Sequence, residues 1–315
     1  PIAVKAVDLP AGVTSVPTAI GPGQDGVNLT LHATAKAATG RVHPIRIVGS
    51  ARVRNADFQS AATITEALET DLGAMPYPPE ALSTAAAVGI AAPAPFNLRT
   101  EPAELVFGRN LSATVKVIAE RQKGFDEEIA LAVVPLERQP KPNSKPRHPP
   151  LPNGLKAALK PIPKGASSVE ITFSADNEPQ LAEFTAVLEG TLKKGNQPHV
   201  EPAPGLALKL EEPFHLSIAA VPGKLARKGQ LKLKITARRN PAFKGEITLA
   251  CSSLPKGVKA LPAKLAAGVT EQELVLTAAP EAAVGTIKDA RVRGESKVGS
   301  NKFSVRIPLA GVVVE

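Results

Sequence analysis

Apolar and polar residues alternate along most of this chain with a period of two. In the segment 231–236, leucine or isoleucine occupies every second position, and lysine or threonine occupies the positions between. This pattern predicts strands that bury one face and expose the other to water. Turns rich in glycine and proline separate these runs at intervals of roughly 8 to 15 residues, as the strands of a β-sandwich require. Helix-compatible stretches are confined to 60–72 and 79–87.

One turn signal, Leu-Pro-x-Gly followed by an aliphatic residue, occurs three times, at 9–13, 151–155 and 254–258. The second and third copies also match over most of a module, in which Phe96 corresponds to Phe214. Repeats in a constant order indicate tandem copies of one structural unit. Seven or so short strands in about 100 residues predict an Ig-like or fibronectin-III-like antiparallel sandwich for that unit. The predicted fold class is therefore all-β, with tandem Ig-like sandwiches.

The spacing of matched positions predicts the domain organisation. Pro1 corresponds to Glu246, so we expect the first sandwich to be incomplete at its N-terminus. A half-sandwich exposes an apolar face and an unpaired edge, which either the missing N-terminal part of the polypeptide or another protein subunit is expected to cover. The predicted parts are the C-terminal half of a sandwich at 1–53, an inserted segment or linker at 54–85, a sandwich at 86–205 with a Pro-rich insertion at 135–150, and a basic sandwich at 206–315.

Composition narrows the class further. The single cysteine, Cys251, excludes an internal disulfide and is expected to be a quiet core or edge thiol. The absence of tryptophan argues against an antibody-type domain, which packs one beside its disulfide. No run of apolar residues is long enough for a membrane-spanning segment, so none is expected.

The formal net charge of +9 originates in the third module, where 214–315 holds 17 Lys and Arg against 7 Asp and Glu. Some of these cations alternate on predicted strands and would face outward together. Such a surface would attract an anionic polymer such as a polysaccharide, and a plain solvated face is the alternative. Nucleic acid is not favoured, because single-strand binders interleave aromatic side chains for base stacking and this face has none. The candidate residues for an anionic-partner surface are Lys232, Lys234, Arg238, Arg239, Arg291 and Arg293.

No constellation of residues typical of catalysis is recognised. The five histidines lie in unrelated places without the spacing of metal ligands. A nucleophile elbow, a Walker loop and a dinucleotide fingerprint are also missing. We therefore expect no catalytic, cofactor-binding or metal site in these residues, no cofactor, and no enzyme activity.

The order of turns and strands in the third module is similar to a known type of module. The turn at 254–258 is followed by Leu-x-Leu-Thr-Ala ending at Ala278, then Gly285, then Val292-x-Gly294. This resembles the tandem Ig-like modules of large exported bacterial proteins, which accompany pre-peptidase C-terminal type domains or exported hydrolases. The resemblance covers nearly all of 96–315 and about half of the first module. It implies a sandwich fold and an extracytoplasmic location (periplasm, cell surface or secreted), and it carries over no catalytic residue.

The function expected from these observations is structural. The chain is expected to supply non-catalytic interaction modules of a secreted or cell-surface bacterial protein, within a larger assembly. One alternative is an accessory region of a large exported hydrolase or protease whose catalytic part precedes Pro1. Another is an anionic glycan-binding module, which the aromatic content of 3% disfavours, because sugar sites usually stack on exposed aromatic rings.

Overall fold

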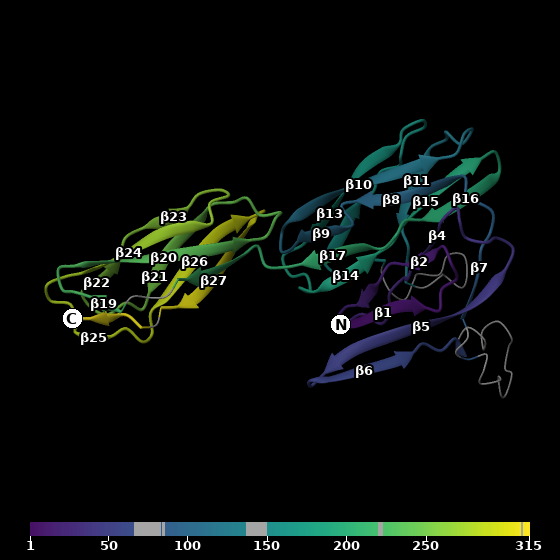
Figure 1. The fold of residues 1–315 in the computed structure, drawn as a ribbon. Coiled ribbons are helices and arrows are strands. Elements are labelled where there is room, and N and C mark those ends of the chain that lie inside the picture. Colours follow the sequence, from purple (N-terminus) through teal and green to yellow (C-terminus); the bar gives the residue numbers. More distant parts are fainter. Residues whose placement is uncertain (66–82, 84–85, 137–149, 220–222, 310) are drawn as a thin grey trace. The chain divides into compact units, whose positions relative to one another are not determined.

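The computed structural model describes residues 1–65, 83, 86–136, 150–219, 223–309 and 311–315. Every named element in the described residues is a β-strand, so the chain is an all-β protein of tandem Ig-like sandwiches (Figure 1). Of the two helix-compatible stretches, 60–61 ends strand β6 (Ala56–Ala61) and 86–87 begins strand β7 (Ala86–Gly89). Residues 65 and 83 are helical, and 66–82 and 84–85 lie outside the described residues. Within the described residues, no helix has the length and apolar character needed to cross a membrane.

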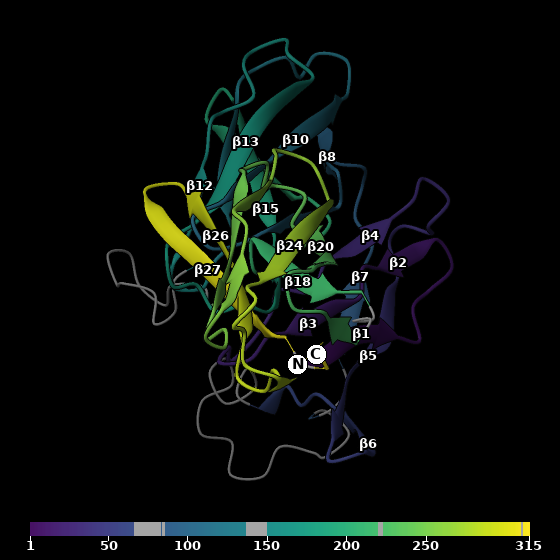
Figure 2. The same ribbon diagram turned by 90° about the vertical axis from the view of Figure 1, so that its left-hand side faces the viewer.

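The third module is a sandwich of two four-stranded sheets, with a small three-stranded sheet beside them. Aliphatic side chains of both large sheets form a single buried cluster, as the period-two pattern predicts. Figure 2 shows β24, β20 and β18 side by side in the first sheet. In order across each sheet, the strands are β22 (Val258–Ala260), β24 (Glu271–Ala278), β20 (Gln230–Arg239) and β18 (Phe214–Ile218); β23 (Ala263–Leu265), β21 (Ile247–Ser252), β26 (Arg291–Val298) and β27 (Asn301–Pro308); and β19 (Lys224–Leu225), β28 (Val313–Val314) and β25 (Gly285–Thr286).

The second module repeats this arrangement in the same register. Phe96 pairs with Arg121 as Phe214 pairs with Arg239, and Ile129 and Ile247 are both fully buried. The counterpart of β23 is reduced to one bridge, between Ile129 and Ile162. Its strands, in sheet order, are β12 (Leu155–Ala158), β13 (Ser168–Ala175), β10 (Ser112–Arg121) and β8 (Phe96–Glu101); β11 (Ile129–Val133), β15 (Leu188–Lys194) and β16 (Gln197–Pro202); and β14 (Glu183–Ala186), β17 (Leu206–Leu210) and β9 (Glu104–Phe107).

The first module contains the counterparts of six third-module strands. Ile2 pairs with Ile20 as Ile247 pairs with Leu265, and the other pairings among these six strands keep the same offset of 245 positions. Among the described residues of this module, no strand corresponds to β18 or β20. Its strands are β1 (Ile2–Val7), β3 (Thr18–Ile20), β5 (Val42–Val53) and β6 (Ala56–Ala61) in one sheet, β2 (Val13–Ser15) and β4 (Leu31–Ala33) in the other, and β7 (Ala86–Gly89), which pairs with β5.

Two segments differ from the expected boundaries. Residues 56–61, expected in the inserted segment, form β6, whose pairing of Val53 with Ala56 matches that of Val298 with Asn301. Residues 86–89, expected at the start of the second sandwich, pair with β5 of the first module. The sequence of β6 does not predict a strand, because both faces of β6 are exposed and its residues need not alternate between apolar and polar.

The repeated Leu-Pro-x-Gly turn has one conformation in all three modules. The glycine has a φ of 81° to 83°, a left-handed conformation that glycine adopts without a steric penalty. The aliphatic N–H donates to the proline carbonyl over 3.0 to 3.1 Å, as in a type II turn. The aliphatic side chain that follows is buried in each case. The turn at Gly12, Gly154 and Gly257 therefore directs the strand that follows it into the core.

The chain forms two compact units. The first comprises Pro1–Leu105, Thr114–Phe173 and Ala182–Lys209, and the second comprises Val106–Ala113, Ser174–Leu181 and Leu210–Glu315. In the first unit, Asn28 Nδ2 donates to the carbonyl of Val134 over 3.1 Å. The first two modules are thus joined by hydrogen bonds as well as by the chain.

Candidate functional site

The six predicted cations do not share one surface. Lys232, Lys234 and Arg238 lie on the outer face of β20, while Arg291 and Arg293 lie on β26, in the opposite sheet. The residues that alternate with them are buried in the same core, so the cations of the two strands face in opposite directions. An anionic polymer that contacted one group would leave the other group in solvent.

Most of these cations also have an acidic neighbour. Lys232 Nζ lies 2.9 Å from Glu273 and Lys234 Nζ lies 2.8 Å from Glu271, both across the β20–β24 pair. Arg293 pairs with Glu295, and Arg238 lies 3.9 Å from Glu211. Exposed pairs of this kind add little stability, but they reduce the local positive potential. The module's net charge therefore overstates the cation density on the outer face of β20.

Arg239 is a structural residue. Its guanidinium donates three hydrogen bonds to backbone carbonyls, and its partial burial lowers the pKa of the group below the usual value. Arg121, the equivalent residue of the second module, donates to four carbonyls in the same way. The position of Arg239 in the sequence predicts a place on the anionic-partner surface; the signal for its structural role is the arginine at the equivalent position of both modules. The acceptors of Arg239 are Gly245 at 2.6 Å, Ala266 at 2.9 Å and Val269 at 2.9 Å.

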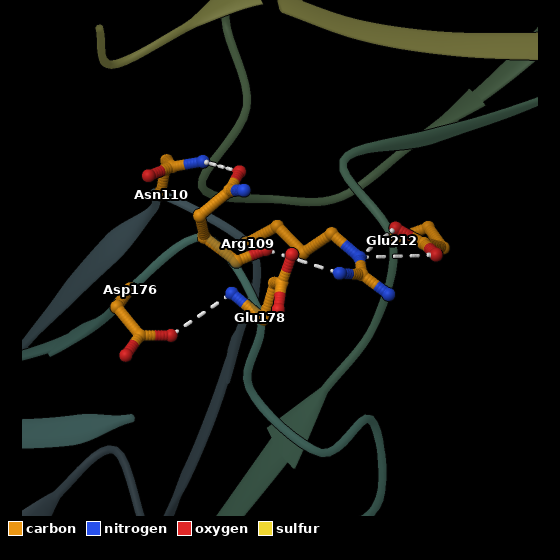
Figure 3. A network of polar contacts seen from close by, with 6 residues as sticks. Arg109, Asn110, Asp176, Glu178 and Glu212 are labelled. Atoms are coloured by element: carbon orange, nitrogen blue, oxygen red, sulfur yellow. Dashed lines mark hydrogen bonds and ion pairs between the residues drawn. The ribbon is translucent and has the colours of Figure 1, made fainter. Parts of the chain in front are cut away.

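A polar network lies in the second unit (Figure 3). Arg109 Nε donates to Glu212 over 3.0 Å, and its Nη1 donates to the carbonyl of Asn177 over 3.0 Å. Asn110 Nδ2 donates to Asn177 Oδ1 over 2.9 Å, and Asn110 Oδ1 accepts from Asn301 over 2.9 Å. These contacts hold 106–113 and 174–181 to the third module.

The first module exposes side chains whose counterparts are buried. Ile2 is 42% exposed, whereas its counterpart Ile247 is fully buried. Val53 is 52% exposed, whereas its counterpart Val298 is 2% exposed. Phe58 is also largely exposed. These three apolar residues, Ile2, Val53 and Phe58, define a surface that we call the open face.

A cleft of about 420 Å³ borders strand β4 in the first unit. Leu31, His32 and Ala33 line one side, and residues 88–94, Asn97 and Glu201 complete it. Burial raises the pKa of the Glu201 carboxyl above its usual value. Across the described residues, no three His, Cys, Asp or Glu side chains gather closely enough to hold a metal ion. The cleft leaves the edge of β4 accessible, and this is its most relevant property.

Cys251 lies on β21, partly buried at the edge of the third module's core. Burial raises the pKa of its thiol from 9.0 to about 11. Only the thiolate is a strong nucleophile, so the folded protein keeps this thiol unreactive near neutral pH.

We expect Cys251 to make the free energy of unfolding depend on pH between about 9 and 11. In this window the folded protein retains the thiol proton while the unfolded chain releases it, so stability falls as pH rises. Denaturant titrations at several pH values, compared with the Cys251→Ser variant, measure the effect. The extra decline should be absent from the variant; equal pH dependence of both proteins would contradict the prediction.

The paired sheets, the shared register and the common turn decide the architecture. The chain is a tandem array of Ig-like β-sandwich domains. No family model and no curated protein matches the sequence. Similar solved structures include the D0–D1 domain of intimin, with 10% identity, a TM-score of 0.23, and coverage of 69% of this chain and 93% of that one.

Two further solved structures show a similar degree of likeness. A protein of unknown function from Porphyromonas gingivalis W83 has 12% identity and a TM-score of 0.23, with coverage of 69% of this chain and 99% of that one. Titin-A168169 has 10% identity and a TM-score of 0.22, with coverage of 71% and 98%. Likeness at this level carries no information about partners or activity.

Proposed function

We propose that this chain is a non-catalytic structural and interaction module of an exported bacterial protein, at the cell surface or in secreted form, and that it holds that protein within a larger assembly. The observation that carries the proposal is the open face of the first module. Ile2, Val53 and Phe58 are each 42% to 57% exposed at one end of a sheet. Contiguous exposed apolar side chains on a soluble domain mark sites of protein contact.

The rest of the molecule supports a structural role. The second and third modules bury their aromatic and aliphatic side chains in continuous cores, and arginines with fixed hydrogen bonds hold their loops. The cations on the outer face of β20 are matched by glutamates of β24. The apolar open face, rather than this charged face, is therefore the surface that we assign to a partner.

A photo-crosslinking residue at position 58, introduced into the protein in its source cells, tests this function. We expect one predominant protein adduct, identified by mass spectrometry, because Phe58 projects from the open face. The matched control carries the same residue at Lys264, an exposed position on β23 of the third module. Adducts of equal yield at the two positions, or no adduct at position 58, would rule out the proposed interface.

A further inference from the structure

We infer that the open face of the first module is a preformed receptor for a β-hairpin, supplied by a separate partner protein. The inference deepens the proposed function and rests on it only for the biological role. Its occupant has a defined pattern: a first strand with Phe-x-Leu and a second strand with aliphatic residues at alternate positions. Both other modules of this chain carry such a pair of antiparallel strands in the equivalent place, as β8 with β10 and β18 with β20; the connection within each hairpin includes a short strand of another sheet, β9 or β19.

A glycine shows where the phenylalanine belongs. Gly190 and Gly294 occupy equivalent places on β15 and β26. A Cβ atom at Gly294 would lie 2.5 Å from Leu216 and 3.3 Å from Phe214, the two residues of the Phe-x-Leu pair. A Cβ at Gly190 would meet Phe96 and Leu98 in the same way. Glycine at this position therefore makes room for the Phe-x-Leu strand.

The first module keeps this glycine without the strand. Gly49 lies 245 positions before Gly294, in the same register of its sheet. Among the described residues, a Cβ there would meet Ile2 at 3.3 Å and the Ser60 carbonyl at 4.0 Å. No described residue of the first module thus fills the space that Phe and Leu fill in the other two.

The aromatic neighbour of that space is also present. In the third module the Phe214 ring packs edge-to-face against Phe303, with ring centroids 5.2 Å apart. Phe58 is the counterpart of Phe303 on the neighbouring strand, and it is 57% exposed. An incoming phenylalanine would restore this aromatic pair and cover Ile2.

Backbone pairing is available as well. In the third module β24 pairs with β22 on one side and with β20 on the other. Residues 31 and 32 of strand β4 correspond to residues 276 and 277 of β24, which pair with β20, whereas residues 26–30 are in no strand. Among the described residues β4 pairs only with β2, and the cleft borders it. Addition of a strand to such an edge supplies main-chain hydrogen bonds, and the pockets for alternate side chains supply specificity.

The occupant does not come from these 315 residues. All nine phenylalanines of the chain lie in described residues. Phe96 and Phe214 already fill the equivalent space of their own modules, where both are fully buried. A second copy of the chain would have to open one of its own cores to donate such a hairpin.

A synthetic peptide of residues 95–122, which form the β8–β10 hairpin of this chain, is the probe for the receptor. Labelled with a fluorophore and titrated against the full chain, it should bind saturably in a one-to-one complex. Hydrogen exchange at the amides of β1 and β4 should slow on binding. A control peptide with Phe96→Ser and Leu98→Ser should not bind, because it lacks the two side chains that the open space accepts.

Substitutions in the chain locate the binding site. Gly49→Val fills the open space and should weaken peptide binding by about tenfold or more, because overpacking of this kind typically costs 1–3 kcal/mol. Ser50→Val, on the opposite face of the same strand, should leave binding unchanged and serves as the matched control. Phe58→Ala removes an exposed side chain without disturbing the core and should also weaken binding. Thermal unfolding of each variant confirms that the chain remains folded.

Three results would overturn the inference: no saturable binding of the peptide, equal binding by the Gly49→Val variant, or a dimer of the chain that competes with the peptide. The last result would assign the open face to a second copy. Peptide binding without an adduct at position 58 in cells would instead refute the proposed function and leave the receptor intact. An adduct without peptide binding would retain the interaction function and refute the hairpin as its ligand.

Discussion

Gly294→Val is expected to destabilise the third module by about 3 kcal/mol, at the upper end of the usual cost of overpacking a core. The new Cβ would lie 2.5 Å from Leu216 and 3.2 Å from Ile247, and the two methyl groups would need still more space. Both neighbours belong to the buried cluster, so relief requires a shift of packed side chains. Guanidinium unfolding, followed through labelling of Cys251, measures the loss, because the only cysteine of the chain lies in this module.

Gly49→Val is the matched comparison, since it makes the same change at the equivalent place of the first module. Among the described residues, its Cβ would meet a flexible isoleucine at 3.3 Å and the Ser60 carbonyl at 4.0 Å, and valine suits a strand. We expect a change below about 1 kcal/mol. Similar losses at both positions would show that the first module is filled as the third is, contrary to the structure.

Arg239→Met should cost the third module about 3 kcal/mol, because hydrogen bonds from a charged donor contribute roughly 1.5–3 kcal/mol each and partial exposure reduces their sum. The substitution retains an apolar stem and removes the donors to three carbonyls. Arg239→Lys should recover only part of the loss, because an ammonium cannot reproduce the planar array of donors. Denaturant unfolding with Cys251 labelling again reports on the correct module.

Arg238→Met is the control for Arg239, since it changes the neighbouring residue of the same strand and removes the same charge. Arg238 is 72% exposed and lies 3.9 Å from its acidic neighbour, so its removal should change stability by less than about 0.5 kcal/mol. If the Arg238 and Arg239 variants proved equally stable, the structural role assigned to Arg239 would be wrong.

Much of the fold could be predicted from alternation and repetition. The buried face of each strand follows from positions such as Leu231, Leu233 and Ile235, which are all buried, with exposed residues between them. The glycine turn is predictable because its left-handed conformation restricts the choice of residue. Strand β6 escaped this approach, since an edge strand exposed on both faces carries no apolar period.

The candidate site could be predicted less well. The spacing of the cations indicates which side chains point outward from a strand, as those of Lys232 and Lys234 do. It does not reveal that Arg239 extends back to three carbonyls, or that β24 presents a glutamate to each lysine. These partners belong to strands and loops that only the folded register brings together. The open face becomes apparent only when equivalent positions of the three modules are compared. The most informative of these positions is that of Gly49.

The side-chain amides of Asn28 and Asn110 have a consequence for how this chain is produced. Each residue begins an Asn-x-Ser/Thr sequence, and each amide nitrogen already donates a hydrogen bond, to Val134 and to Asn177 respectively. The same nitrogen would carry an N-linked sugar in a eukaryotic secretory pathway. A sugar would replace one of the two hydrogens of that nitrogen and add bulk where the native contact forms, so glycan occupancy in such a host would record how long each segment stays unfolded after it enters the lumen.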